Sequence, residues 1–127
     1  MDKKKILIVD DEHDFVDLVK LRLETNNYQV ITAYDGEQAL NIAAQEKPDL
    51  MLLDILMPKV DGVKVCQKLK NNPLTAGIVI IILTAKDRPE DIKLAKQAGS
   101  DEYIVKPFDD QTLLFSIKQL LNRVKGS

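Results

Sequence analysis

The feature that most constrains the fold is a series of short, unbroken apolar runs. Residues 6–9, Leu50–Leu53 and 78–83 are apolar throughout, and residues 103–105 form a weaker run of the same kind. A strand with one face in water alternates apolar and polar residues, whereas a strand covered on both faces does not. These runs therefore predict the buried strands of a parallel sheet. Residues 28–33 are β-branched and partly alternating, which favours an edge strand.

The segments between the runs have the apolar spacing of amphipathic helices, with apolar side chains three and four residues apart. The predicted helix faces are Phe15, Leu18, Val19 and Leu23; Ala39, Leu40 and Ala43; Val63, Cys66 and Leu69; Ile92, Leu94, Ala95 and Ala98; and Leu113, Leu114, Ile117, Leu120, Leu121 and Val124. Strands that alternate with helices predict a three-layer α/β/α sandwich. We expect a doubly wound, flavodoxin-like parallel sheet of five strands in the order 2-1-3-4-5, flanked by five helices.

Length and charge restrict the classes of protein to consider. The chain has 127 residues, so we expect one domain spanning 1–127. Its 18 basic and 20 acidic residues give a net charge of −2, which offers no electrostatic reason for direct nucleic-acid or membrane binding. The single cysteine, Cys66, excludes an internal disulfide and favours a reducing compartment. No apolar run approaches the ~20 residues that span a bilayer, so we predict a cytoplasmic protein.

Polar and charged residues stand where four of the predicted strands end. Asp10 and Asp11 follow the first strand and Asp54 the third, while Thr84 and Lys106 close the fourth and fifth. Each alone has an ordinary explanation as a turn residue or a helix cap. The carboxyl ends of parallel strands meet at one edge, however, so we expect these side chains to converge on one crevice.

Such a crevice has a definite chemistry. Three neighbouring carboxylates disfavour joint ionisation, and a hard divalent cation such as Mg²⁺, or Mn²⁺, removes that cost. Lys106 offers an ammonium and Thr84 a hydroxyl to the oxygens of a phosphoryl group. The predicted set therefore suits transfer of a phosphoryl group to a carboxylate.

Four motifs resemble the receiver domain of response regulators in two-component signalling, a chemotaxis-regulator-like superfamily. They are VDDE at 9–12, LDILMPKVDG at 53–62, LTA at 83–85 and AGSDEYIVKPF at 98–108. The motifs occur in the family's order and at similar spacing, and the resemblance covers essentially the whole chain.

The resemblance implies an acceptor and a metal site. Asp54 is implied to accept a phosphoryl group from the phosphohistidine of a sensor histidine kinase or a histidine phosphotransfer protein. Asp10, Asp11, Asp54 and the backbone carbonyl of Leu56 are implied to hold Mg²⁺. Glu12 has no firm role in the family.

The resemblance also implies a switch. Thr84 is implied to hydrogen-bond the phosphoryl group and Lys106 to form an ion pair with it, while Tyr103 turns inward when Thr84 moves. The peptide bond between Lys106 and Pro107 is implied to be cis. Leu56 and Lys86 are implied to flank the path of the attacking water, so we expect them to tune the rate of self-dephosphorylation.

The implied protein is a signalling switch rather than an enzyme that acts on an external substrate. Its signal is implied to be read on the face formed by the fourth helix, fifth strand and fifth helix, near Tyr103, Lys93, Lys96 and Gln97. The receiving partner is either a separate protein or a C-terminal output domain missing from this chain. A monomer and a phosphorylation-dependent dimer both remain open.

Three other functions deserve comparison. A flavin carrier of the same fold needs a Ser/Thr/Gly-rich loop after the first strand, and the acidic residues 10–12 would repel the flavin phosphate. An aspartyl phosphatase would carry its nucleophile on that first strand and leave Asp54 without a role. A degenerate receiver would act by contact alone, which the full set of expected residues disfavours. We expect His13 to be exposed rather than a ligand, and Met51 and Met57 to serve packing.

Overall fold

Five parallel strands form one sheet in the computed structural model, which describes residues 3–58 and 61–126 and the side chains up to Arg123. Lys59 and Val60 of the receiver-like motif, and the side chain of Val124, lie outside the described part. The strands are β1 (Lys5–Val9), β2 (Gln29–Ala33), β3 (Leu50–Leu53), β4 (Val79–Thr84) and β5 (Glu102–Val105). The order is β2-β1-β3-β4-β5 and every neighbouring pair is parallel. The predicted topology and the edge position of β2 are confirmed.

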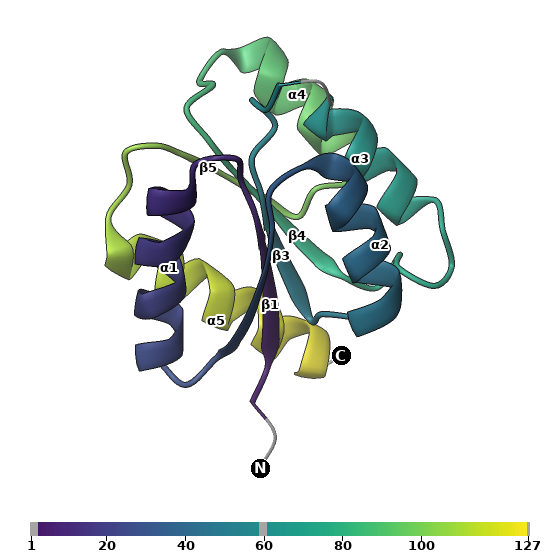
Figure 1. The fold of residues 1–127 in the computed structure, drawn as a ribbon. Helices are drawn as coiled ribbons and strands as arrows, with labels where there is room; N and C mark the ends of the chain where they lie inside the picture. The colour runs from purple at the N-terminus through teal and green to yellow at the C-terminus, as the bar shows by residue number, and fades with distance from the viewer. Residues whose placement is uncertain (1–2, 59–60, 127) are drawn as a thin grey trace.

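Helices cover both faces of this sheet. They are α1 (His13–Thr25), α2 (Gly36–Glu46), α3 (Gly62–Lys70), α4 (Pro89–Gln97) and α5 (Asp110–Gly126). Helices α1 and α5 lie on one face and α2, α3 and α4 on the other (Figure 1). This is the predicted three-layer sandwich. None of the described helices is both long and apolar enough to cross a membrane.

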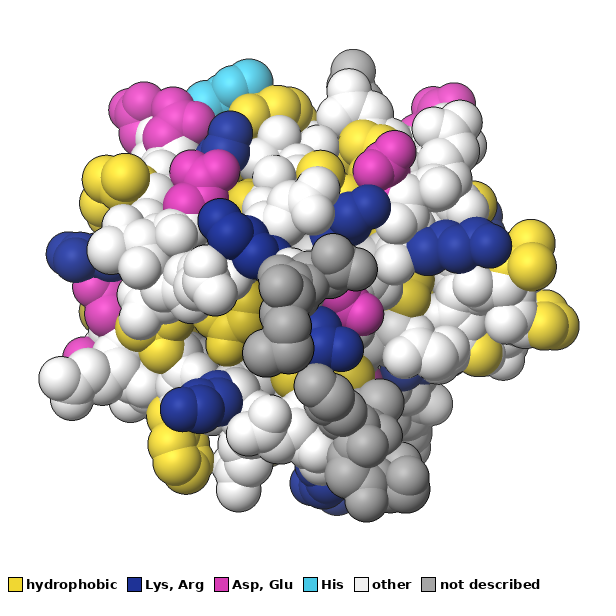
Figure 2. All heavy atoms as spheres, turned by 90° about the horizontal axis from the view of Figure 1, so that it is seen from below, with side chains coloured by type: hydrophobic (Ala, Val, Ile, Leu, Met, Phe, Trp, Pro, Cys, Tyr) yellow, Lys and Arg dark blue, Asp and Glu magenta, His cyan; other side chains and the backbone are white. Residues whose placement is uncertain are grey.

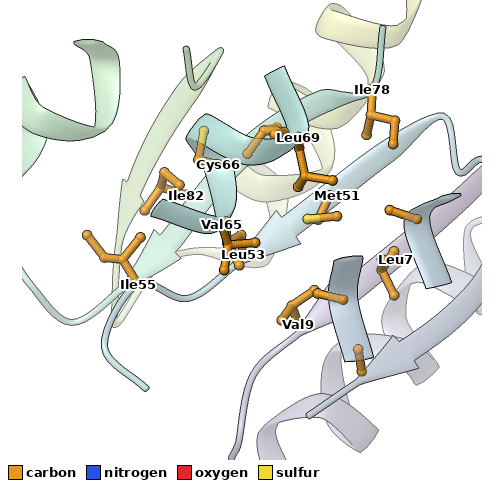
Figure 3. Packing of buried hydrophobic residues seen from close by; sticks show 14 of the residues in the cluster. Leu7, Val9, Met51, Leu53, Ile55, Val65, Cys66, Leu69, Ile78 and Ile82 are labelled. Atoms are coloured by element: carbon orange, nitrogen blue, oxygen red, sulfur yellow. The ribbon is translucent and has the colours of Figure 1, made fainter. Parts of the chain in front are cut away.

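The apolar runs are unbroken because successive residues of each central strand enter different cores. Leu7 and Met51 belong to the core on the side of α2, α3 and α4, part of which Figure 3 shows, whereas Ile8 and Leu52 belong to the core on the side of α1 and α5. All four residues of β3 are buried, and so are all six of β4. Fully burying a large apolar side chain stabilises the folded state by about 1.5–3 kcal/mol. Strands that are covered on both faces therefore bind the helical layers on either side to the sheet.

Two packing predictions are confirmed. Cys66 is fully buried on α3, and its Sγ lies 3.6 Å from the Ala98 carbonyl oxygen, to which it donates. Burial raises the pKa of this thiol to about 11, which disfavours the reactive thiolate. Met51 and Met57 are both buried in the same core.

Two predicted helix faces are partly wrong. Leu18 is 57% exposed. The buried residues of α1 are Val16, Val19 and Leu23, and the middle of the face that they form lies about 130° around the helix from Leu18. On α4, Leu94 is 51% exposed and Ile92 is 38% exposed. The core contact of α4 is made by small side chains, Ala95 and Ala98, so this helix packs closely through a narrow face.

The loop that leads into α3 is fixed by a helix cap and by a close approach of two backbone segments. Asp61 caps α3, its Oδ1 accepting a hydrogen bond of 2.9 Å from the Val63 N–H. Gly62 follows it, and a Cβ at this position would lie 2.4 Å from the Ile55 Cα. Only glycine permits that approach, so α3 begins close against the segment that follows β3.

The opposite edge of the sheet, where the strands begin, is polar. Lys3, Lys5 and Lys47 line a hollow there together with Glu24 and Asp49. Figure 2 views the molecule from this side, and its basic side chains are spread out rather than gathered in one patch. Charge of this kind is largely screened at physiological salt.

Candidate functional site

Adjacent strand ends bring the predicted site residues together. Val9, which precedes Asp10, pairs in register with Leu53, which precedes Asp54. Thr84 is the last residue of β4 and pairs with Val105, which precedes Lys106. Because all the strands run the same way, these ends form one edge of the sheet. The strand ends that carry these residues therefore meet at one edge, as predicted.

The three predicted carboxylates form one cluster. Asp10, Asp11 and Asp54 each present an oxygen, and these oxygens all lie within 4.8 Å of one another. Asp10 and Asp54 are buried, with exposed fractions of 2% and 5%. Backbone N–H groups orient both, since Leu56 donates to Asp54 Oδ1 over 2.8 Å and Glu12 donates to Asp10 Oδ1 over 3.0 Å.

Lys106 supplies the cation that faces the cluster. Its Nζ donates to Asp10 Oδ2 over 2.7 Å and to Asp54 Oδ2 over 3.3 Å, and it lies 3.9 Å from the centre of the Phe15 ring. Burial alone lowers the pKa of Lys106, but the hydrogen bond that its ammonium donates to Asp10 and the attraction of Asp54 outweigh this effect, so the pKa is raised. The lysine is therefore held in its charged form.

The charges at this edge do not balance. Burial raises the pKa of Asp10, although the hydrogen bond that Asp10 accepts from Lys106 opposes the rise. One ammonium faces three carboxylates, and the described ion pairs of Lys106 go to Asp10, Asp54 and, at 3.9 Å, Glu12 rather than to Asp11. Oxygen donors with surplus negative charge are what Mg²⁺ and Mn²⁺ prefer, so these residues fit such an ion.

Thr84 and Tyr103, the predicted switch residues, both contact Lys86. Thr84 is fully buried, and its Oγ1 accepts a long, 3.5 Å contact from the Lys86 N–H. The hydroxyl of Tyr103 donates to the Lys86 carbonyl over 2.9 Å. Burial and the nearby charges of Asp91 and Asp54 raise the pKa of Tyr103 to about 12, so its hydroxyl keeps its proton. Lys86 is therefore the residue that links Thr84 to Tyr103.

Some contacts of the site have no signal in the sequence. The Phe15 ring supports Lys106 from α1, and the Asp91 carboxylate lies 3.9 Å from the Lys86 Nζ. His13 is exposed, as predicted, and its ring stacks on Tyr34 at 3.9 Å. Each of these pairs joins different elements, and spacing along the chain does not reveal such contacts.

Two further features border the site. The Lys106–Pro107 peptide bond is cis, as predicted. A groove of about 490 Å³ runs between α1 and the segment from β5 to α5, and Phe15, Leu18 and Phe108 supply apolar walls. The exposed side chain of Leu18 is thus part of a groove next to Lys106.

The residues at this edge lie within a match to a known protein family. The model of the response regulator receiver domain matches residues 6–118, which include all the clustered side chains. The chain belongs to this family. Its site residues lie at the carboxyl edge of a receiver domain. Such domains are signalling proteins rather than classical enzymes.

Relatives and solved structures agree with this assignment. The alkaline phosphatase synthesis transcriptional regulatory protein PhoP of Bacillus subtilis is 46% identical over 94% of this chain and 49% of its own length. The DNA-binding dual master transcriptional regulator RpaA of Synechocystis is 41% identical over 94% of this chain and 49% of its own. This receiver domain thus spans about half the length of these curated relatives.

Receiver domains of known structure have the same fold. A CheY-like receiver domain protein from Methanospirillum hungatei superimposes with a TM-score of 0.93 at 32% identity, covering 98% of each chain. The BeF3-activated N-terminal receiver domain of RstA from Klebsiella pneumoniae gives 0.87 at 30% identity, covering 93% of this chain and 98% of that one.

Proposed function

We propose that this receiver domain is a switch that is turned on when Asp54 accepts a phosphoryl group. The observation that carries the proposal is the position of the Asp54 carboxylate, within 4.8 Å of the carboxylate oxygens of Asp10 and Asp11 and 3.3 Å from the Lys106 Nζ. A buried carboxylate held among other carboxylates is poorly solvated. It is therefore a suitable nucleophile when a cation shares the site.

The donor in this proposal is the phosphohistidine of a sensor histidine kinase or a phosphotransfer protein. An Asp54 carboxylate oxygen forms a bond to phosphorus as the bond from phosphorus to the histidine nitrogen breaks, and the nitrogen keeps the electron pair. Asp10, Asp11, Asp54 and the Leu56 carbonyl would hold Mg²⁺, which when bound would supply positive charge against the phosphoryl oxygens. Lys106 adds a second positive charge.

The response in this proposal passes through Thr84 and Tyr103. A phosphoryl group carries about −1.5 to −2 charge at neutral pH, so it attracts hydrogen-bond donors such as the Thr84 hydroxyl. Movement of Thr84 changes its contact with Lys86, whose carbonyl accepts the Tyr103 hydrogen bond. The inward state of Tyr103 then alters the face of α4, β5 and α5, including Lys93, from which the signal is read.

The signal ends by self-dephosphorylation. A water oxygen attacks phosphorus, the bond from phosphorus to the Asp54 oxygen breaks, and the carboxylate and inorganic phosphate result. Leu56 and Lys86 flank this approach in the proposal, and Leu56 is an exposed apolar residue that offers water no hydrogen bond. The domain acts in the cytoplasm, with an output domain or a separate protein as target, as a monomer or a phosphorylation-dependent dimer.

Intact mass tests the proposal directly. Wild type and Asp54→Ala are incubated with Mg²⁺ and acetyl phosphate, and beryllofluoride binding is measured in parallel. We expect one phosphoryl group, and Mg²⁺-dependent beryllofluoride binding, in wild type but not in Asp54→Ala. Asp61→Asn is the matched control, since Asp61 is exposed and caps α3, and it should label as wild type does. An unlabelled wild type that also fails to bind Mg²⁺ would leave only an interaction module.

A further inference from the structure

The loop that follows β4 is tied to α4 by a carboxylate that the acceptor site does not use. Asp91 is in the first turn of α4, and its Oδ1 lies 3.9 Å from the Lys86 Nζ. Its Oδ2 lies 3.8 Å from the Arg88 Nε. The Lys86 carbonyl meanwhile accepts the hydrogen bond from Tyr103, and the Lys86 N–H makes only the long contact with Thr84. The direction of the Lys86 side chain is therefore left to Asp91.

Burial shows which of the two cations Asp91 orients. The side chain of Asp91 is only 12% exposed, and a carboxylate this sheltered needs a charged partner. Arg88 is 72% exposed and also pairs with Glu90 at 3.5 Å, so it is a solvated and shared partner. Lys86 is 38% exposed and has Asp91 as its described acidic partner. Asp91 and Lys86 thus form the more sheltered pair.

We propose that Asp91 is a positioning residue that holds the Lys86 ammonium against α4 and so keeps phospho-Asp54 open to water. This inference rests on the proposed function of Asp54. Lys86 is two residues beyond Thr84 and carries its charge on a flexible four-carbon stem. Once released from Asp91, the ammonium is attracted by the phosphoryl group, whose charge is about −1.5 to −2. It then covers the phosphoryl oxygens and obstructs the attacking water.

A double-mutant cycle on the intact chain tests this. Wild type, Asp91→Asn, Lys86→Met and the double variant are phosphorylated with acetyl phosphate and Mg²⁺, and the half-life of the phosphoryl adduct is measured by intact mass. Because a partly exposed ion pair has a small energy, we expect Asp91→Asn to lengthen the half-life about twofold to fivefold. In the Lys86→Met background, Asp91→Asn should have no effect.

Glu90→Gln is the matched control. Glu90 is in the same helical turn and loses the same charge, but its described pair is with Arg88 rather than Lys86. It should keep the wild-type half-life. A general loosening of α4 caused by Asp91→Asn appears in both backgrounds, and an equal change in both therefore overturns the proposal.

The other outcomes are also decisive. An unchanged or shorter half-life in Asp91→Asn, with wild type fully labelled, refutes the positioning role and leaves Asp54 as acceptor. A wild type that takes no phosphoryl group refutes the proposed function, and the role of Asp91 falls with it.

Discussion

Asp11 provides the sharpest test of the electrostatics at the acidic edge. Its carboxylate lies within 4.8 Å of those of Asp10 and Asp54, and it is not among the described partners of Lys106. Asp11→Asn therefore removes repulsion without removing an ion pair to Lys106. We expect the variant to be more stable than wild type when divalent cations are absent.

The size of the gain follows from Coulomb's law. At 4.8 Å, two unit charges repel by about 3.5 kcal/mol at an effective dielectric constant of 20, and by about 0.9 kcal/mol in water. Asp11 is partly exposed, and it repels its neighbour Asp10 in the unfolded chain as well. Only the repulsion from Asp54 counts in full, so we expect about 1–2 kcal/mol. That corresponds to a rise in Tm of roughly 3–10 °C for a domain of this size.

Thermal and urea unfolding in a chelator, at low and at high salt, measure this gain. The gain should shrink in 1 M salt, where the Debye length falls to about 3 Å. Added Mg²⁺ should stabilise wild type more than Asp11→Asn, because the variant lacks one ligand of the proposed site.

Asp14→Asn is the control for Asp11→Asn. Asp14 is exposed in the first turn of α1, where a negative charge interacts favourably with the helix dipole. Removing this charge should lower the stability by about 0.3–1 kcal/mol, whereas Asp11→Asn should raise it. If Asp11→Asn were as stable as wild type in the chelator, or less stable, the three carboxylates would not repel one another as their positions require.

Three further changes test other parts of the structure. Lys106→Met should lower the free energy of unfolding, measured in urea at neutral pH, by about 3–5 kcal/mol, because it leaves buried carboxylates without their cation. Added Mg²⁺ should recover part of the loss. An unchanged stability would contradict this account. Leu56→Asn should shorten the half-life of the phosphoryl adduct by giving the attacking water a hydrogen-bond partner, whereas an unchanged half-life counts against a role for Leu56. Gly62→Ala should lower the stability by about 1–3 kcal/mol through overpacking against the Ile55 backbone. Gly77→Ala should change it little, because a Cβ at Gly77 meets no atom of the described residues within 4 Å. Equal losses would refute the packing argument.

The fold could be predicted because its signals are local and repeat. The uniformly apolar runs of β1, β3 and β4 required cover on both faces, and parallel strands then placed Asp10, Asp54 and Lys106 at one edge. These inferences need only the order of residues along the chain. The order of residues also states which chemical groups follow each strand, so the carboxylates and the ammonium of the cluster could be predicted together with the fold.

Contacts between elements could not be predicted in the same way. Leu18 has the spacing of a core residue, but the centre of the buried face of α1 is set by how that helix lies on the sheet. The approach of Asp91 to Lys86 depends on the direction in which α4 leaves its loop. Side-chain pairs of this kind are fixed by tertiary packing rather than by periodicity, so only the structure identifies them.

The charge at the acidic edge connects its resting arrangement with its proposed response. Asp10, Asp11 and Asp54 carry three negative charges and Lys106 one positive charge, which leaves two negative charges for a divalent ion to balance. Phosphorylation replaces the single charge of Asp54 with about −1.5 to −2, so the balance is lost again. Thr84 is a neutral donor at the end of β4, the strand adjacent to β3, and its present contact, the 3.5 Å approach of the Lys86 N–H, is weak. Little energy is therefore needed to release Thr84 toward a phosphoryl group, which is why we expect the switch to begin at this residue.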